Sequence, residues 1–255
     1  MNIAEKIKKL QDYFIAGKFK KVIDGCEILK KKLPNNTFIL NLSGMAYQKL
    51  DNDHKAINFF ESALKADNTN IAAMNNLANS LKNIEQYFKA EQIYKKIIKM
   101  NPDYINAYNN YGNLKSDMND TENAIKLFEQ GLNIAEEKNI NPLVFLNHLA
   151  LEFQSINKIT ETKETVNKIL KINPKNIGAH QILSSIYKYS LTNKETMTHV
   201  SEMKKILSDN DFEDDQKGII SFALGKAYDD LKDPETAIKF LSAGNEFMQK
   251  IKKSN

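Results

Sequence analysis

Apolar side chains along this chain recur with the spacing of amphipathic helices, and the whole pattern returns about every 34 residues. Each period contains one helical stretch, a tight turn and a second helical stretch. We place the repeats at residues 3–36, 37–70, 71–104, 105–142, 143–176, 177–217 and 218–251, with the sixth irregular. A few residues inserted around Glu136 to Asn141 lengthen the fourth repeat. The pattern predicts an all-α fold of about seven helical hairpins.

Small and large residues occupy fixed places in the repeat. Position 8 is small in six repeats, at Gly44, Ala78, Gly112, Ala150, Ser184 and Gly225. Small residues at this place predict a close approach of the two helices of a hairpin. Position 24 carries large residues such as Phe60 and Phe128, which we expect to fill the space between repeats. Pro34, Pro102 and Pro174 fall at position 32, where one helix has ended and the next has not begun.

One repeat shows the pattern most clearly, at Ala107, Tyr108, Gly112, Ala124, Phe128 and Leu132. On these residues the chain resembles the tetratricopeptide repeat family, and the resemblance covers almost the whole chain. It implies a right-handed α-solenoid, a superhelix that takes in residues 1–255 as a single domain. It also implies that the first helix of each repeat lines a concave surface, which holds a protein or peptide partner.

Asparagine is the main residue type expected on that concave surface. The predicted binding groove consists of Asn75, Asn76, Asn79, Asn83, Asn106, Asn109, Asn110, Asn113, Asn147 and His148. A row of carboxamides offers donors and acceptors to the backbone of an extended peptide without reading its side chains. The alternative stays open that Asn is simply abundant throughout this chain.

Two known uses of such repeats can be compared with these positions. At repeat position 6, Asn76 and Asn110 resemble the asparagine ladder of O-linked N-acetylglucosamine transferases, whereas Leu42 and His148 interrupt it. The carboxylate clamp that grips acidic chaperone C-termini needs Lys or Arg at its groove positions. In the third and fourth repeats those positions hold neutral residues, Ala72 and Asn106 among them. We therefore expect no chaperone clamp.

Charge narrows the classes of partner. The net charge is +4, and all 36 basic residues are lysine. Arginine supplies the planar fork used for bidentate capture of phosphate, so a chain without arginine and without a long basic run is not expected to bind nucleic acid. His54, His148, His180 and His199 lack metal-ligand spacing, and no phosphate-binding loop or nucleophile motif is present. We expect no catalytic activity, no cofactor and no metal.

Compartment signals are few. Cys26 is the single cysteine, which excludes an intrachain disulfide. The chain enters amphipathic sequence directly after its first residues, without a signal peptide, and no stretch is long enough to cross a bilayer. We expect a cytoplasmic protein that does not bind membranes.

The C-terminal third carries a second, narrower resemblance. The segment from His180 to Ser190, the acidic stretch Asp209 to Asp215 and the segment from Ser221 to Leu231 follow one another in this order. Over about residues 177–247 they resemble the last repeats of bacterial tetratricopeptide sulfotransferases. The resemblance implies the scaffold of a larger enzyme or a paralogue that lost it. No phosphosulfate-binding loop follows Gly244, so this chain is not expected to transfer sulfate by itself.

Three functional hypotheses follow. The first is a protein-interaction scaffold that binds an extended peptide in the asparagine-lined groove. The second is the substrate-recruiting domain of a sulfotransferase, with a glycosyltransferase as a variant. The third is a spacer or dimerisation surface, because apolar residues of the last helix, such as Phe247 and Ile251, leave room for a homodimer.

Overall fold

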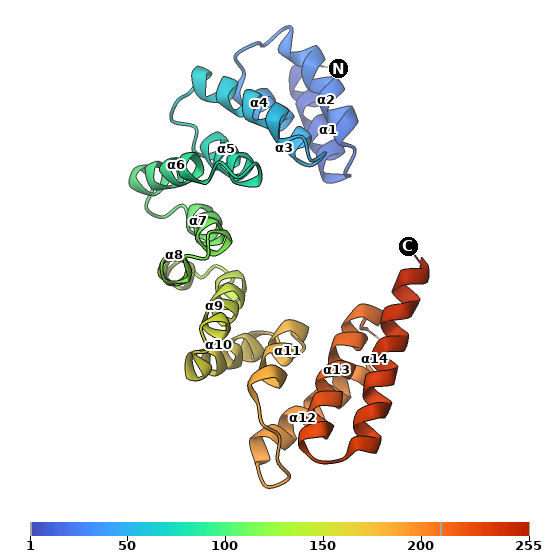
Figure 1. Ribbon diagram of the computed structural model, residues 1–255. Helices are drawn as coiled ribbons and strands as arrows, with labels where there is room; N and C mark the ends of the chain where they lie inside the picture. The colour runs from blue at the N-terminus through green and yellow to red at the C-terminus, as the bar shows by residue number, and fades with distance from the viewer. Residues whose placement is uncertain (1, 210, 255) are drawn as a thin grey trace. The chain divides into compact units, whose positions relative to one another are not determined.

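The computed structural model describes residues 2–209 and 211–254, which form fourteen α-helices and no β-strand (Figure 1). The helices are α1 (Ile3–Ile15), α2 (Phe19–Lys30), α3 (Thr37–Gln48), α4 (Asp53–Ala66), α5 (Ile71–Asn83), α6 (Tyr87–Met100), α7 (Ile105–Asp117), α8 (Thr121–Glu137), α9 (Leu143–Ser155), α10 (Ile159–Ile172), α11 (Ile177–Ile186), α12 (Lys194–Ser208), α13 (Asp214–Asp230) and α14 (Pro234–Ser254). The all-α solenoid of helical hairpins is confirmed. The chain divides into two compact units, Met1–Ile134 and Ala135–Asn255, with the boundary inside α8.

In the first unit each hairpin packs against the next through its second helix. Helix α2 packs on α3, α4 on α5 and α6 on α7. Helix α5 also contacts both α3 and α7. We call the surface formed by α1, α3, α5 and α7 the A face. This face is built from the first helix of each repeat, which is the helix expected to carry the binding residues.

The glycines at repeat position 8 let the two helices of a hairpin come close together. A Cβ added at Gly44 would lie 2.4 Å from Cε1 of Phe60, and one added at Gly112 would lie 2.4 Å from Cε1 of Phe128. Both phenylalanines are completely buried. These rings therefore pack inside their own hairpins. From the sequence they were expected to fill the space between repeats, and this contact was not predicted.

The turn inside a hairpin has a recurring backbone geometry. In six hairpins a residue two or three places after the end of the first helix has a positive φ, at Gly17, Asp51, Glu85, Asn119, Asn157 and Lys232. The amide of this residue and the amide after it both donate back across the turn, as from Gly17 to the carbonyl of Phe14 and from Lys18 to that of Tyr13. The left-handed residue reverses the chain within a few residues, so the second helix can return along the first.

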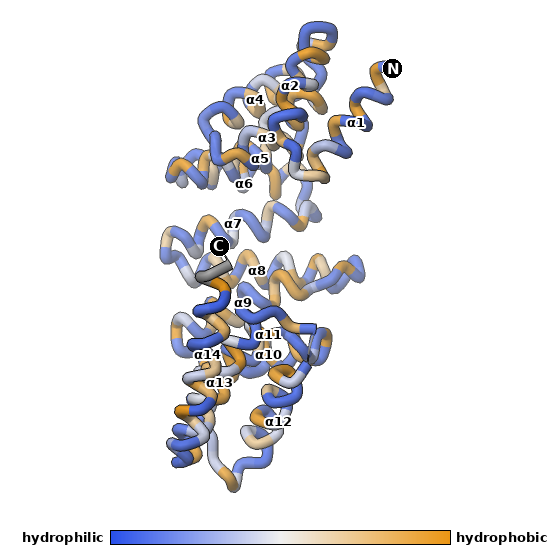
Figure 2. The backbone as a smooth tube through the Cα atoms, turned by 90° about the vertical axis from the view of Figure 1, so that its right-hand side faces the viewer, coloured by the Kyte–Doolittle hydropathy of each residue, from blue (hydrophilic) through white to orange (hydrophobic). Residues whose placement is uncertain are grey.

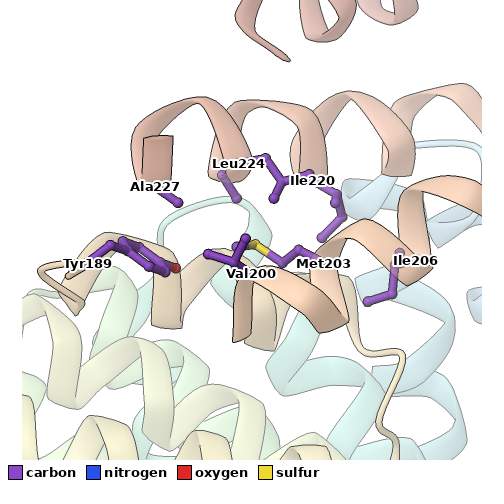
Figure 3. Close-up of a cluster of buried hydrophobic side chains, with 8 residues drawn as sticks. Tyr189, Val200, Met203, Ile206, Ile220, Leu224 and Ala227 are labelled. Atoms are coloured by element: carbon purple, nitrogen blue, oxygen red, sulfur yellow. The ribbon is translucent and has the colours of Figure 1, made fainter. Parts of the chain in front are cut away.

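The second unit departs from regular hairpins at α11. This helix ends at Ile186, and residues 187–193 are irregular before α12 begins. Helices α11 and α12 both pack on α13, and the rings of His180 on α11 and His199 on α12 meet between the two helices. Figure 3 shows the side chains of α12 and α13 that meet, with Val200 and Met203 facing Ile220 and Leu224. Helix α13 is therefore a common packing partner for both helices of the sixth hairpin.

Helix α13 starts at Asp214, before the expected repeat start near Gly218. A capping box between Glu213 and Gln216 fixes this start, and two acidic residues occupy the first turn. Negative charge at a helix N-terminus is favourable because it faces the positive end of the helix dipole. The acidic stretch Asp209 to Asp215 thus ends in the first turn of a helix.

Apolar and polar residues alternate along the helices, so that blue and orange segments succeed one another in each of them (Figure 2). This is the pattern of helices with one buried face. Among the described residues, no helix is both long enough and apolar enough to cross a lipid bilayer.

Candidate functional site

The asparagines of the A face are bonded to one another across repeats. The amide nitrogen of Asn76 on α5 donates to the side-chain oxygen of Asn41 on α3, at 3.1 Å. The amide nitrogen of Asn110 on α7 donates in the same way to Asn75 on α5, at 3.0 Å. In both pairs the donor lies 35 residues after the acceptor. We call these two pairs the asparagine clasps.

Each clasp leaves hydrogen-bonding capacity unused. A carboxamide has two N–H donors and an oxygen with two lone pairs, and a clasp uses one donor and one lone pair. The oxygen of Asn110, which its clasp does not use, accepts one hydrogen bond from the amide of Asn109 at 3.3 Å and keeps one lone pair. Asn76 and Asn110 remain half-exposed. The clasps therefore hold carboxamides in fixed orientations while donors and acceptors are left over.

Asn79 and Asn83 turn away from the A face. The oxygen of Asn79 accepts a 2.5 Å hydrogen bond from the hydroxyl of Tyr94 on α6, inside the hairpin. The amide of Asn83 donates to the carboxylate of Asp53 on α4, at 3.2 and 3.3 Å. Both side chains are thus engaged with second helices, and the structure does not bring them together with the clasps.

The remaining predicted groove residues fall into two groups. Asn106 and Asn113 lie on α7, the first exposed and the second half-buried. Asn147 and His148 lie on α9, in the second unit, and both are half-buried. Burial lowers the pKa of His148, and the charge of Glu152 acts in the opposite direction. The predicted set is therefore distributed over two units rather than gathered at one described site.

Sequence reasoning missed Asn41, which the structure places in a clasp. Its signal was available, because Asn41 stands at the same repeat position as Asn75, Asn109 and Asn147. The predicted groove included position 5 of the third, fourth and fifth repeats but no residue of the second repeat, so the pairing of Asn76 with Asn41 was not foreseen. A further link between repeats runs from Gln48 to Ser80, whose side chains are 3.0 Å apart.

A small apolar pocket of about 250 Å³ opens between α1 and α3, at one end of the A face. Phe14, Ile15, Phe38 and Leu42 line it, and Asn41 of the first clasp contributes to its wall. Ile15 is 85% exposed, although it is a large apolar residue. The pocket and the clasp therefore share a residue.

The second unit contains a larger pocket, of about 920 Å³, between α10 and α12. Its wall includes His199, which belongs to a buried chain of hydrogen bonds. The hydroxyl of Tyr189 lies 2.7 Å from Nδ1 of His199, and Nε2 of His199 lies 3.0 Å from Nδ1 of His180. Nε2 of His180 lies 2.9 Å from the carbonyl oxygen of Pro174. Within the described residues, no cluster of three or more His, Cys, Asp or Glu side chains could hold a metal ion.

A family model described as tetratricopeptide repeat matches residues 70–137, and a second model with the same description matches residues 39–70. Residues 39–137 are tetratricopeptide repeats. Within this region the repeat prediction is confirmed. The match includes α5 and α7, which carry the asparagine clasps.

A curated relative and several solved structures are similar to this chain. The uncharacterized protein ycf37 of Porphyra purpurea is 34% identical over 85 residues, which are 30% of this chain and 49% of ycf37. The chain therefore spans about half the length of that relative.

Among solved structures, a tetratricopeptide repeat protein from Parabacteroides merdae has a TM-score of 0.63 at 16% identity, covering 96% of this chain and 92% of that one. PilW, a type IV pilus biogenesis factor, has a TM-score of 0.62 at 18% identity, covering 80% and 90%. YrrB, described as having an unusual peptide-binding site, has a TM-score of 0.56 at 14% identity, covering 74% and 91%. At these identities the similarity shows the fold.

Proposed function

We propose that this tetratricopeptide repeat chain is a protein-interaction scaffold, and that the A face of its first unit binds an extended segment of a partner protein. The observation that carries the proposal is the pair of asparagine clasps. They present oriented carboxamides at the same place in successive repeats.

The clasps suit a peptide backbone for two reasons. An extended peptide presents an N–H and a C=O at every residue, and the spare donors and acceptors of Asn76 and Asn110 are complementary to these groups. The clasp also fixes each carboxamide before binding, so less side-chain entropy is lost when the peptide docks. The description of YrrB as a peptide-binding repeat protein supports this class of ligand for the fold.

The clasps also have a structural interpretation, in which they only hold neighbouring repeats together. Both interpretations predict lower stability when a clasp is broken, by about 0.5–1.5 kcal/mol for each hydrogen bond. Only the binding interpretation predicts a loss of affinity in a variant that is still folded. An experiment must therefore measure both quantities.

The test uses peptides selected from a random displayed library on the wild-type protein, with affinities measured by fluorescence anisotropy. The double variant Asn76→Ala with Asn110→Ala is expected to bind them about tenfold more weakly or worse, since two oriented carboxamides are lost. Asn83→Ala is the matched control, because it removes an asparagine of α5 whose bond runs to Asp53 rather than along the A face. It should leave peptide affinity unchanged.

Equal peptide affinity of the wild type and the folded double variant would contradict the proposal. In that case the clasps would be assigned to holding the repeats together. Failure to select any peptide whose binding depends on the A face would argue against a peptide groove at this surface.

The sulfotransferase-associated hypothesis rests on the resemblance of residues 177–247 and predicts a catalytic domain in the same gene product. Sequencing the gene beyond Asn255 tests it.

A homodimer through α14 is the remaining hypothesis. This helix exposes Ile238 by 62% and Leu241 by 40%. Sedimentation of Ile238→Ser beside the wild type would detect a dimer that depends on this face.

A further inference from the structure

A pocket lies beside the irregular sixth hairpin, with side chains of α10, α11 and α12 in its wall. The rings of His180 on α11 and His199 on α12 meet between the two helices, and the hydroxyl of Tyr189 bonds to His199. His180 and His199 stack with ring centroids 5.1 Å apart, and Tyr187 meets the edge of His199 at 5.5 Å. The pocket of about 920 Å³ opens beside these rings.

The inner surface of this pocket is apolar and aromatic. Leu170 of α10, Leu183 of α11 and Ile206 of α12 line it together with the rings of Tyr187 and His199. Its volume lies in the range of about 300–1,000 Å³ that is usual for small-molecule sites, which are mostly apolar with a few polar groups. The surface therefore suits the body of a small organic ligand.

His199 can contact such a ligand with the face of its ring, but neither of its ring nitrogens is available for a hydrogen bond. The carbonyl of Pro174 can only accept, so Nε2 of His180 carries the proton and its Nδ1 accepts from Nε2 of His199. Nδ1 of His199 then accepts from the hydroxyl of Tyr189. Both nitrogens of His199 are thus used, and polar recognition has to come from the rim of the pocket.

The rim of the pocket carries an excess of positive charge when the charged residues that form ion pairs are left out of the count. Lys175 pairs with Asp209 at 2.5 Å, and Glu195 pairs at 2.8 Å with Lys163, which lies outside the pocket. Lys171, Lys194, Lys205 and Glu202 also line the pocket. None of these four side chains has an ion-pair partner among the described residues. Three lysines therefore remain against one carboxylate.

We propose that this pocket binds a small organic anion, a carboxylate or sulfonate with an aromatic or aliphatic body. The body would lie against Leu170, Leu183 and the ring of His199, while Lys171, Lys194 and Lys205 neutralise the acidic group. The site lies wholly in the second unit and does not depend on the proposed peptide surface of the first.

The histidine rings provide a direct test, because the chain has only four histidines. Ring signals of His199 are followed by NMR while 1-naphthalenesulfonate is added to the full chain. The expected result is a saturable shift of the His199 signals, with no shift for His54, which is exposed on α4 in the other unit. The cation 1-naphthylmethylammonium has a similar body and is expected to bind at least about tenfold more weakly.

Charge-reversal variants separate the rim from general surface charge. Lys171→Glu with Lys205→Glu is expected to weaken naphthalenesulfonate binding by at least about tenfold. Lys168→Glu with Lys204→Glu is the matched control on the same two helices, because neither residue lines the pocket. Circular dichroism verifies that both variants are folded.

The proposal is overturned by any of three results: no saturable shift of His199 at millimolar naphthalenesulfonate, equal affinity for the cation, or equal weakening by both pairs of variants. The first would mean that the pocket has no affinity for an aromatic anion. The other two would mean that binding is apolar or nonspecific and that the lysines of the rim do not direct it.

Discussion

At Gly112, an added Cβ would lie 2.4 Å from Cε1 and 2.7 Å from Cδ1 of Phe128, which is completely buried. The ring cannot move away easily in a packed interior, so Gly112→Ala is expected to lower the free energy of unfolding by about 1–3 kcal/mol. Chemical denaturation followed by circular dichroism measures this change.

Gly178→Ala is the matched control, since the nearest atom to its added Cβ is 3.5 Å away, an ordinary contact. Alanine is favoured over glycine in a helix by about 0.5–1 kcal/mol, so this variant should be neutral or more stable. If Gly112→Ala were as stable as the wild type, the close approach of α7 and α8 at this residue would be wrong. Adding Phe128→Leu to Gly112→Ala should recover part of the loss.

His199 makes stability depend on pH. Burial, together with the neighbouring His180, lowers the pKa of His199 to about 3, whereas an unfolded histidine has a pKa of about 6.5. Between these values the unfolded chain binds more protons, so stability is complete above about pH 6.5 and falls as the pH decreases toward the folded pKa. At about pH 4.5 the loss from this residue is about 2–3 kcal/mol.

Denaturant unfolding at neutral and acidic pH, read through the tyrosines near α12, measures this loss. His199→Gln should be less stable at neutral pH and lose less stability on acidification than the wild type. His54→Gln replaces an exposed histidine and should keep the wild-type pH dependence. An unchanged pH dependence in His199→Gln would show that other groups control the acid response.

At the scale of the element, the turns of six hairpins each contain one left-handed residue, and most of these residues are not glycine. Glu85 has a φ of 61° and Gly17 has a φ of 68°. A left-handed conformation costs a residue with a Cβ about 1–2 kcal/mol, and glycine escapes this cost but loses more entropy on folding. Glu85→Gly is therefore expected to raise the free energy of unfolding by up to about 1 kcal/mol.

Gly17→Ala is the reciprocal change, with an expected loss of about 1 kcal/mol or more. No atom lies within 4 Å of the Cβ that it would add, so backbone strain is the only cause of the loss. Thermal unfolding of both variants tests the pair. A gain of stability for Gly17→Ala would contradict the left-handed turn.

Helix starts and turns were the most predictable elements, because they depend on local sequence. Helices α3, α5 and α7 begin at Thr37, Ile71 and Ile105, the residues that open the repeats in the sequence pattern. The start of α13 could not be obtained from the 34-residue spacing, since a capping box at Glu213 extends this helix beyond the repeat. The 34-residue period shows where packing positions recur, but it does not show where an N-terminal capping box lengthens the helix of one repeat.

Features of the candidate sites were harder to predict when they depended on contacts between residues far apart in the sequence. Asparagines on first helices were visible in the sequence, but which of them pair was not. Asn79 turns to Tyr94 and Asn76 to Asn41, although both lie on α5, because the direction of each side chain depends on packing between helices. The pocket beside His199 was not predicted at all, since it depends on how the irregular sixth hairpin packs, with side chains from α10, α11 and α12 in its wall.

At the scale of the whole molecule, the principal contacts join elements that are close in sequence, as in α4 with α5 and α12 with α13. In such a chain each repeat is stabilised mainly by its neighbours, so damage to one repeat should remain local. Phe60→Ala removes a completely buried ring and is expected to cost about 3–5 kcal/mol. Hydrogen exchange should then become faster in α3, α4 and α5 and stay unchanged in α13 and α14.

The reciprocal variant is Met203→Ala, which removes a completely buried side chain of the second unit at a cost of about 2–5 kcal/mol. It should accelerate exchange in α12 and α13 and leave α3 to α5 protected, because each repeat is stabilised mainly by its neighbours in sequence. Equal acceleration in both units by either variant would mean that the chain unfolds as one cooperative body. Opposite local patterns would show that the two units are stabilised separately, so that a ligand of one unit could bind while the other is unfolded.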